Sequence, residues 1–194
     1  MIDSAEQNLN MGKAFVFGDD INTDVLAPGA YLKYSPEEMS KHCLESIDPN
    51  FVKDVKPGDI VVGGKNFGVG SSREQAAASL VILGVRYVVA KNFSRIFYRN
   101  AFNLGLTPLI CDDYIKINQQ DILKINAEKG IITNLTQENT YSINSVPEHL
   151  LKIVRAGGLL EELKDKIRNK SIKTLRHRKD NWIPSKKIQK NIKV

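Results

Sequence analysis

Hydrophobic residues in the first 111 positions gather in short runs separated by longer, mixed segments. Four runs have the length of buried strands and lie at residues 13–17, 60–62, 86–90 and 108–111. Two mixed segments have the length of helices, residues 73–83 and 94–104, and a glycine directly follows each. Glycine commonly follows a helix, because it adopts the left-handed backbone conformation without strain. Strands that alternate with helices in this way predict βαβ units with right-handed crossovers in a parallel sheet.

The pattern changes after residue 113, where apolar and polar residues alternate over short stretches. These stretches lie at residues 114–117, 122–125, 130–133 and 141–143. Such alternation is typical of antiparallel strands with one buried face, so we expect a second small sheet or layer. A further helix is expected to start at residues 145–148, to be interrupted at Gly157 and Gly158, and to resume over residues 159–163.

Residues 18–35 connect the first predicted strand to a helix expected at residues 36–45, with Ser35 as its N-cap. Asp24 lies between apolar residues in this segment. An Asx-type turn or a helix cap explains an aspartate there without any chemistry. Lys33 precedes the helix, and we expect it on a mobile connector.

Composition indicates one folded domain with a basic appendage. The chain has 194 residues, of which 42% are hydrophobic, and this is enough for a sizeable core. Its formal net charge is +6, but residues 164–194 hold 12 of the 28 Lys and Arg residues and 2 of the 22 Asp and Glu residues. We therefore expect a mildly acidic α/β domain at residues 1–170 and a flexible basic extension at residues 171–194.

The sequence offers neither a targeting signal nor a membrane span. The first ten residues lack a basic start followed by an apolar run, and no stretch approaches the length of a bilayer span. We therefore expect a cytoplasmic protein with no membrane partner. Cys43 and Cys111 are the only cysteines and lie far apart, which argues against a disulfide scaffold and against a metal or iron–sulfur site built by this chain alone.

The stretch richest in candidate chemistry follows the second predicted strand. Its loop holds four glycines and leads into Ser71, Ser72 and Arg73 at the start of the predicted helix. Ser71 stands three residues before Glu74, and Ser72 three before Gln75, so either pair fits a capping box. A helix N-terminus carries partial positive charge and Arg73 adds a full one, which favours an anion beside the serine hydroxyls. The sequence thus predicts a cradle for a carboxylate or phosphate.

Better-known glycine motifs do not match this loop. A P-loop ends in Gly-Lys-Ser/Thr, a dinucleotide-binding turn has Gly-x-Gly-x-x-Gly, and a nucleophile elbow has Gly-x-Ser-x-Gly. Residues 68–73 are Gly-Val-Gly-Ser-Ser-Arg. The three histidines show no sequence relation to Ser71 that would indicate a catalytic triad. On the residues alone, a purely structural turn and an anion-binding site both remain open.

Three segments together resemble one known family. Residues 18–24 are Gly-Asp-Asp-Ile-Asn-Thr-Asp, residues 64–74 are Gly-Lys-Asn-Phe-Gly-Val-Gly-Ser-Ser-Arg-Glu, and residues 90–101 are Ala-Lys-Asn-Phe-Ser-Arg-Ile-Phe-Tyr-Arg-Asn-Ala. In this order they closely resemble the small subunits of isopropylmalate isomerases, the detached swivel domains of the aconitase family. The resemblance runs from about residue 12 to residue 168.

The resemblance implies a swivelling β/β/α three-layer domain with a parallel βαβ core. It also implies half of a hydro-lyase, which interconverts 2-isopropylmalate and 3-isopropylmalate in leucine biosynthesis by dehydration and rehydration. The other half would be a large subunit, in a heterodimer or heterotetramer. In this family the large subunit carries a 4Fe-4S cluster, so this chain is expected to bind no metal by itself.

Residue by residue, the resemblance assigns roles within the glycine loop and the segment before it. Ser71 matches the general base and Asp24 an active-site aspartate. Ser72 and Arg73 match ligands of the substrate carboxylate. A serine hydroxyl is a weak acid, and positive charge from Arg73, the helix N-terminus and the loop amides would favour its ionised form.

The sequence departs from the family at three positions. Val69 stands where many relatives have cysteine and Gln75 where many have histidine, and both flank the catalytic residues. At the place of Lys33, an apolar residue suits the isopropyl group and an arginine suits the extra carboxylate of homoaconitase substrates. We expect Lys33 to line the substrate site, either with its aliphatic stem against an apolar group or with its ammonium paired to a carboxylate. Isopropylmalate is placed first, because a lysine on a mobile exposed connector is most often solvated. A homoaconitase, or a dehydratase of the citramalate or dimethylmalate type, is the alternative.

A hypothesis of another class starts from the basic extension. Some relatives of aconitase bind RNA, and residues 176–179 with Trp182 offer cations and a stacking surface. A solvated extension explains the same residues without a ligand. Docking onto the large subunit through Trp182 and Ile183 is a further alternative. We favour an enzyme subunit without a nucleic-acid partner.

Overall fold

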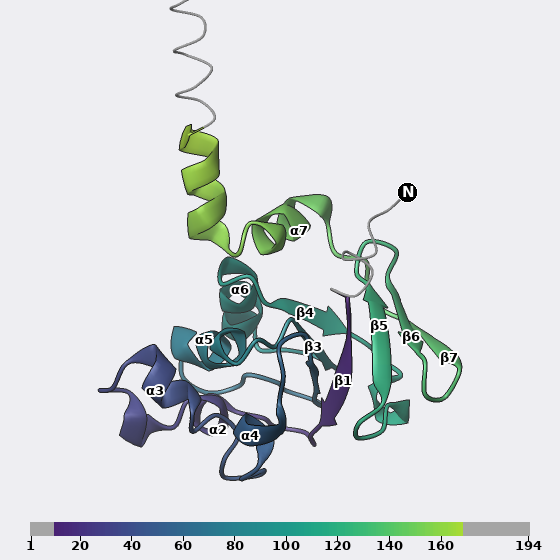
Figure 1. Ribbon diagram of the computed structural model, residues 1–194, viewed down its shortest axis with the longest axis horizontal. Coiled ribbons are helices and arrows are strands. Elements are labelled where there is room, and N and C mark those ends of the chain that lie inside the picture. Colours follow the sequence, from purple (N-terminus) through teal and green to yellow (C-terminus); the bar gives the residue numbers. More distant parts are fainter. Residues whose placement is uncertain (1–9, 169–194) are drawn as a thin grey trace, which may run out of the picture.

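The computed structural model of the chain describes residues 10–168. These residues build a seven-stranded sheet in the order β4-β3-β2-β1-β5-β6-β7 (Figure 1). The strands are Met11–Val16 (β1), Ile60–Val62 (β2), Tyr87–Ala90 (β3), Thr107–Ile110 (β4), Ile122–Asn126 (β5), Ile131–Asn134 (β6) and Asn139–Ser142 (β7). Strands β1 to β4 pair in parallel. The pairs β1–β5, β5–β6 and β6–β7 are antiparallel.

Strand β1 joins the two halves of the sheet. Its residues 14–16 pair with β2 in parallel, and its residues 11–13 pair with β5 in antiparallel register. The predicted parallel core is thereby confirmed. The antiparallel strands join this sheet through β1, so of the two expected arrangements they form a second layer and not a separate sheet.

Residues 114–117 were expected as a strand, and that expectation is wrong. They form the 3-10 turn η2 (Tyr114–Lys116) in the connection from β4 to β5. The Lys116 N–H donates to the Asp113 carbonyl at 2.9 Å and the Ile117 N–H to the Tyr114 carbonyl at 3.1 Å. The backbone is satisfied locally here, so the segment needs no neighbouring strand.

Alternate residues along each strand face opposite layers. Phe15, Val61 and Val88 share one buried cluster with residues of the helices that cover one face of the parallel strands. Ile60, Val62 and Val89 share a second cluster with side chains of the antiparallel strands, namely Leu123, Ile125, Ile132 and Tyr141. Because side chains alternate along a strand, the parallel half lies between the helices and the antiparallel half. The predicted three-layer β/β/α arrangement is confirmed.

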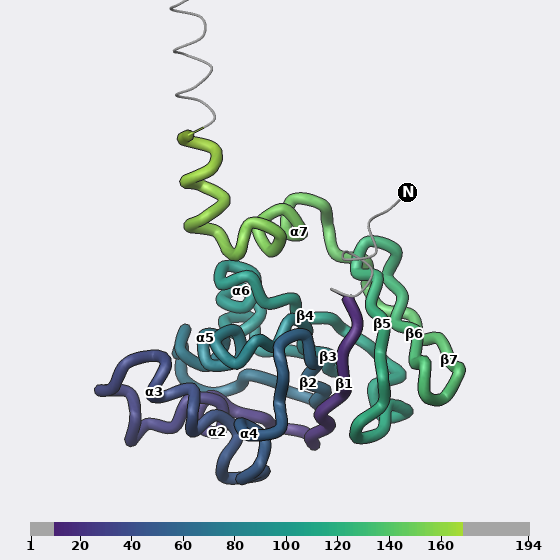
Figure 2. The backbone as a smooth tube through the Cα atoms, viewed as in Figure 1, coloured from purple at the N-terminus to yellow at the C-terminus, as the bar shows by residue number. Residues whose placement is uncertain are grey.

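The helices are α2 (Thr23–Leu26), α3 (Pro36–Ser40), α4 (Phe51–Asp54), α5 (Glu74–Ile82), α6 (Arg95–Asn103) and α7 (Glu148–Arg155), with a 3-10 turn η1 (Gly29–Tyr31). Helices α5 and α6 are the two predicted between the parallel strands. Gly84 has a φ of 84° just after α5, as expected for a glycine that ends a helix. The tube view shows α2 and α3 beside α5, and both contact it (Figure 2).

Two local predictions about helices are wrong. The helix expected at residues 36–45 ends at Ser40, although Ser35 caps it as expected. Beyond it, Leu44 has a φ of 63° and donates its N–H to the Val25 carbonyl at 2.9 Å, so the chain turns back towards α2. Helix α5 has neither predicted capping box, because Arg73 occupies the N-cap position without a side-chain cap.

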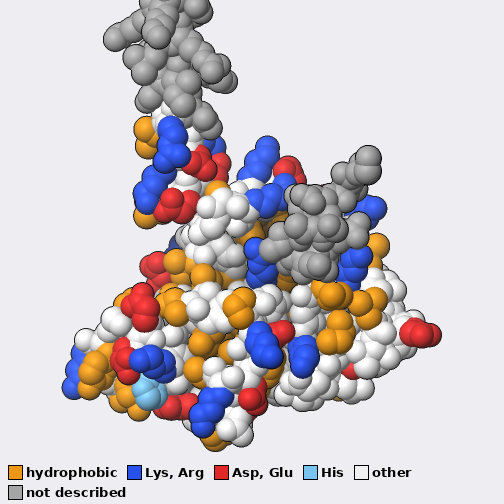
Figure 3. All heavy atoms as spheres, viewed as in Figure 1, with side chains coloured by type: hydrophobic (Ala, Val, Ile, Leu, Met, Phe, Trp, Pro, Cys, Tyr) orange, Lys and Arg blue, Asp and Glu red, His pale blue; other side chains and the backbone are white. Residues whose placement is uncertain are grey.

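The described chain ends in a helix at residues 159–168 that projects from the body (Figure 1). A turn at Gly157 and Gly158, with φ of 87° and 125°, separates it from α7 as predicted. Acidic and basic side chains mix on this helix (Figure 3). The boundary expected at residue 170 and the basic extension, including Trp182 and Ile183, lie outside the described residues. Among residues 10–168, no helix is long and apolar enough to cross a membrane.

Candidate active site

Three loops at the carboxyl ends of β1, β2 and β3 meet around the glycine-rich segment. The loop after β1 pairs with the loop after β2 through the Gly64 N–H and the Gly18 carbonyl at 3.0 Å, and through the Asp20 N–H and the Lys65 carbonyl at 2.8 Å. The loop after β3 joins through the Phe67 N–H and the Asn92 carbonyl at 3.1 Å. Ligands of parallel sheets bind at this edge, so the fold places the loop where a substrate is expected.

Two residues with left-handed backbones fix the contact between the first two loops. Asp20 and Asn66 have φ of 58° and 56°, values that non-glycine residues rarely adopt. The Asn66 Nδ2 donates to Asp20 Oδ1 at 2.9 Å, and the Asn66 N–H donates to Asn92 Oδ1 at 2.7 Å. Asn and Asp tolerate this conformation better than other side chains, and their mutual hydrogen bond stabilises both turns.

Glycines allow the loop to pass close to its neighbours. Gly68 has a φ of 74°, and a Cβ there would overlap the Phe97 side chain of α6. Gly70 has a φ of 118°, and a Cβ there would lie 2.6 Å from Thr23 Oγ1. A side chain at either position would push the segment away from α6 or α2. The glycines therefore determine where Ser71 lies.

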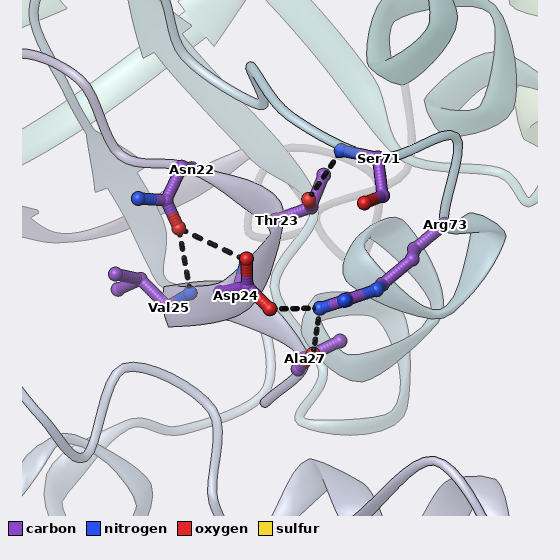
Figure 4. Close-up of polar contacts among 7 residues, drawn as sticks. All are labelled: Asn22, Thr23, Asp24, Val25, Ala27, Ser71 and Arg73. Atoms are coloured by element: carbon purple, nitrogen blue, oxygen red, sulfur yellow. Dashed lines mark hydrogen bonds and ion pairs between the residues drawn. The ribbon is translucent and has the colours of Figure 1, made fainter. Parts of the chain in front are cut away.

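Thr23 holds the serine segment in place. Its buried Oγ1 accepts the Ser71 N–H at 3.0 Å (Figure 4). The Thr23 N–H donates to the Val69 carbonyl at 2.8 Å. The Ser71 side chain is left exposed. Sequence reasoning missed Thr23, although its position beside Asp24 in the Thr-Asp motif was a usable signal.

Arg73 directly follows the two serines and connects the start of α5 to α2 and the residue after it. Its Nη1 pairs with Asp24 Oδ1 and also donates to the Ala27 carbonyl at 3.1 Å (Figure 4). The Arg73 side chain is 20% exposed and that of Asp24 is 65% exposed. A guanidinium carries five N–H donors, so Arg73 retains donors for a ligand carboxylate beyond these two contacts.

The helix cap proposed for Asp24 is formed by its neighbour. Asn22 is the N-cap of α2, and its Oδ1 accepts the N–H groups of Asp24 and Val25 at 2.9 and 3.0 Å. The Asp24 carboxylate is directed to Arg73 instead (Figure 4). Asp24 therefore does not provide the helix cap that could have explained it without chemistry.

The remaining two predicted site residues are less tightly placed. Ser72 is exposed between Ser71 and Arg73. Lys33 is exposed, and its Nζ lies 5.3 Å from the centroid of the Tyr34 ring. Among the described residues, Lys33 makes none of the hydrogen bonds or ion pairs that hold Asp24, Ser71 and Arg73 together. The structure thus assembles three of the five predicted residues into one cluster, extends it with Ser72, and leaves Lys33 on the connector.

The two cysteines lie in the core. Both are buried, and burial raises the pKa of each thiol above its ordinary value. Within residues 10–168, no group of three or more His, Cys, Asp or Glu side chains is arranged to hold a metal ion. The donor set of the described residues therefore does not fit an iron–sulfur cluster.

Comparison with known proteins assigns the chain to a family. Residues 21–113, which contain all five predicted site residues, match the aconitase C-terminal domain. A "3-isopropylmalate dehydratase small subunit 1" of Archaeoglobus fulgidus is 49% identical over 152 residues, 78% of this chain and 94% of the relative. The chain belongs to the family of 3-isopropylmalate dehydratase small subunits.

Other members of this family are similar over the same extent. An "isopropylmalate/citramalate isomerase small subunit" of Methanocaldococcus jannaschii is 46% identical, over 80% of this chain and 94% of that protein. A crystal structure of 3-isopropylmalate dehydratase from the same organism superimposes with a TM-score of 0.79 at 42% identity, covering 84% of this chain and 98% of that one. The family resemblance carried by the glycine loop is confirmed.

Proposed function

We propose that this chain is the small subunit of a 3-isopropylmalate dehydratase, a hydro-lyase that interconverts 2-isopropylmalate and 3-isopropylmalate in leucine biosynthesis. One observation supports this above the others. An exposed serine, Ser71, lies near the partly buried Arg73 at the start of α5, in a chain that belongs to this family. The same arrangement is what removal of a proton beside a carboxylate requires.

Ser71 is the proposed base. Removing its proton is costly, and the positive charge of Arg73 together with the partial charge at the α5 N-terminus lowers that cost. Thr23 fixes the Ser71 backbone, so the hydroxyl oxygen keeps its place when the substrate binds. A serine held in this way can take the proton next to the substrate carboxylate and return it to the neighbouring carbon on rehydration.

Arg73 is the proposed clamp for that carboxylate. A guanidinium binds a carboxylate through two parallel hydrogen bonds, which fixes the orientation of the substrate as well as its position. The contacts with Asp24 and the Ala27 carbonyl hold the guanidinium in one orientation. Ser72, exposed beside it, is the proposed second ligand of the carboxylate, and Asp24 acts through Arg73.

The site needs a second chain. Residues 69–72 are all exposed, so water reaches the proposed base freely, whereas a dehydration requires a site that controls water. A large subunit would close the site in a heterodimer or heterotetramer. We propose that it carries the 4Fe-4S cluster of the family, since the described residues of this chain do not fit one. Such a cluster would supply a Lewis acid from the partner side.

Isopropylmalate is the proposed substrate ahead of the homoaconitase and citramalate alternatives. The Lys33 ammonium lies over the Tyr34 ring and outside the hydrogen bonds of the Asp24–Arg73 pair. This placement favours a solvated cation over a second carboxylate clamp. A higher kcat/KM for homoaconitate than for isopropylmalate would reverse the order.

The test is reconstitution with candidate large subunits under anaerobic conditions with iron and sulfide. Formation of the unsaturated diacid from isopropylmalate is followed with wild-type chain, Ser71→Ala and Ser142→Ala. The Ser71→Ala variant should lose activity by about 10³-fold or more, as expected when a catalytic base is removed. Ser142→Ala, at an exposed residue of β7, should match wild type. Near-normal turnover by Ser71→Ala with unchanged subunit binding would contradict the proposal.

A further inference from the structure

A connector of residues 28–35 runs from the proposed active site to helix α3. At its start, a Cβ on Gly29 would lie 3.8 Å from both Arg73 Nη2 and Asp24 Oδ1. Two residues before Gly29, the Ala27 carbonyl accepts from Arg73 Nη1. At its end, Ser35 caps α3 by accepting the Glu38 N–H at 3.2 Å. Movement of the connector would therefore displace the backbone that lies beside the Arg73–Asp24 pair.

Hydrogen bonds within the connector are too exposed to hold it alone. The Tyr31 N–H donates to the Pro28 carbonyl and the Tyr34 N–H to the Tyr31 carbonyl, both at 3.0 Å. Pro28 and Tyr31 are half-buried, whereas Leu32, Lys33 and Tyr34 are exposed, so water competes above all for the Tyr34 N–H. Packing of a connector side chain must supply the rest of the restraint.

Tyr31 makes that contact. Its ring stacks on the His42 imidazole with centroids 3.5 Å apart and planes within 4°. Tyr31 also lies 6.2 Å from the Tyr34 ring, over which the Lys33 ammonium sits. The rings of Tyr31 and Tyr34 thus link His42, which lies beyond α3, to the residue expected to influence the choice of substrate.

Glu45 fixes the orientation of the imidazole. His42 Nδ1 lies 2.6 Å from Glu45 Oε2. This contact restrains rotation of the imidazole ring about its bond to Cβ. An N–H at Nδ1 donates to the carboxylate in both the neutral and the protonated imidazole. His42 and Glu45 are both half-buried, which reduces the competition from water.

We propose that His42 is a positioning residue for substrate recognition, which holds the connector against Arg73 and Asp24 by stacking on Tyr31 while Glu45 orients its ring. The inference rests on the proposed function, because it names a residue that shapes the same site without touching the substrate. Loss of the stack releases residues 29–34, so the substrate binds to a less ordered site. The base Ser71 is held separately by Thr23, so the chemical step itself is spared.

The experiment compares His42→Ala, His42→Phe and the control His149→Ala, an exposed histidine on α7, in the heteromer. An aromatic stack of this kind changes an equilibrium by about 3- to 10-fold. The KM for isopropylmalate should therefore rise by about 3- to 10-fold in His42→Ala, with kcat within about twofold of wild type. Phenylalanine preserves the stack, so His42→Phe should restore most of the wild-type KM, and His149→Ala should equal wild type.

Hydrogen exchange of the full-length chain gives a second readout that needs no catalysis. The amides of Tyr31 and Tyr34 should exchange faster in His42→Ala and at nearly the wild-type rate in His42→Phe, while amides of α6 stay unchanged in both. An unchanged KM and unchanged exchange in His42→Ala would overturn the inference, and so would a phenylalanine variant as impaired as the alanine one. A wild-type heteromer inactive on isopropylmalate would instead overturn the proposed function, and the exchange data would still decide whether His42 holds the connector.

Discussion

Replacement of Thr23 by valine removes one hydroxyl and keeps the volume of the side chain. Thr23 is 1% exposed, and its Oγ1 accepts the Ser71 N–H at 3.0 Å while Gly70 lies close to the same oxygen. Valine presents a methyl group at that position. The Ser71 amide then has no acceptor in α2, and we expect residues 70–72 to move outwards to reach water.

The substitution should affect stability and reaction rate by different amounts. One hydrogen bond contributes about 0.5–1.5 kcal/mol to the free energy of unfolding, which for a chain of this length corresponds to a fall in Tm of about 1–6 °C. Displacing a reacting group by about 1 Å costs on the order of 100-fold in rate. We therefore expect kcat of the heteromer to fall by about 10- to 100-fold. The KM should change little, because Asp24 and Ala27 hold Arg73 independently.

The assay is steady-state turnover of isopropylmalate at saturating large subunit, with Tm measured on the same preparations. Thr23→Ser is the matched control, because it keeps the hydroxyl and loses the methyl group. We expect its kcat to stay within about threefold of wild type, as Oγ still accepts the Ser71 N–H. Equal kcat values for the valine and serine variants would refute the idea that this hydrogen bond positions Ser71.

Two further predictions concern charge and pH. Arg73→Lys should lower kcat/KM for isopropylmalate by about 10²-fold, because an ammonium cannot bind a carboxylate through two parallel hydrogen bonds while it contacts Asp24 and Ala27; a loss below about threefold at unchanged Tm would contradict the clamp. Burial raises the pKa of the Cys43 thiol above its unfolded value, so its contribution to stability is complete below about pH 8.5 and is lost as pH rises further. Between pH 7.5 and 9.5, the free energy of unfolding measured in urea should fall by about 1.4 kcal/mol less for Cys43→Ala than for wild type. An equal fall for both proteins would contradict this prediction.

Several features of the fold could be predicted from local patterns. The positions of β2, β3, β4, α5 and α6 follow from apolar runs and from helix-ending glycines such as Gly84, because short-range backbone preferences dominate there. The bounds of β2 match the expectation, and no bound of the other four elements differs from it by more than one residue. The strand expected at residues 114–117 failed because its amides find carbonyls in the same turn.

The helix start at α5 shows where local rules lose to tertiary contacts. Ser71 and Glu74 have the spacing of a capping box, yet the Ser71 backbone is engaged by Thr23, 48 residues earlier. That contact holds the segment in the position it adopts before α5, and the helix begins with Arg73 as an uncapped N-cap residue. A capping pattern is reliable only where no distant residue competes for the same groups.

By itself, the sequence determined the parallel core, the glycine loop after β2 and the chemical types of the candidate site, since all three depend on residues near one another in the chain. Tertiary structure alone decided that β1 joins the parallel and antiparallel strands, that Asp24 pairs with Arg73, and that Tyr31 stacks on His42. The Asp24–Arg73 pair joins residues 49 positions apart, and no spacing rule relates them. Such contacts form only when packing of the three layers brings separate loops to the same edge of the sheet, which is why no local pattern in the sequence predicts them.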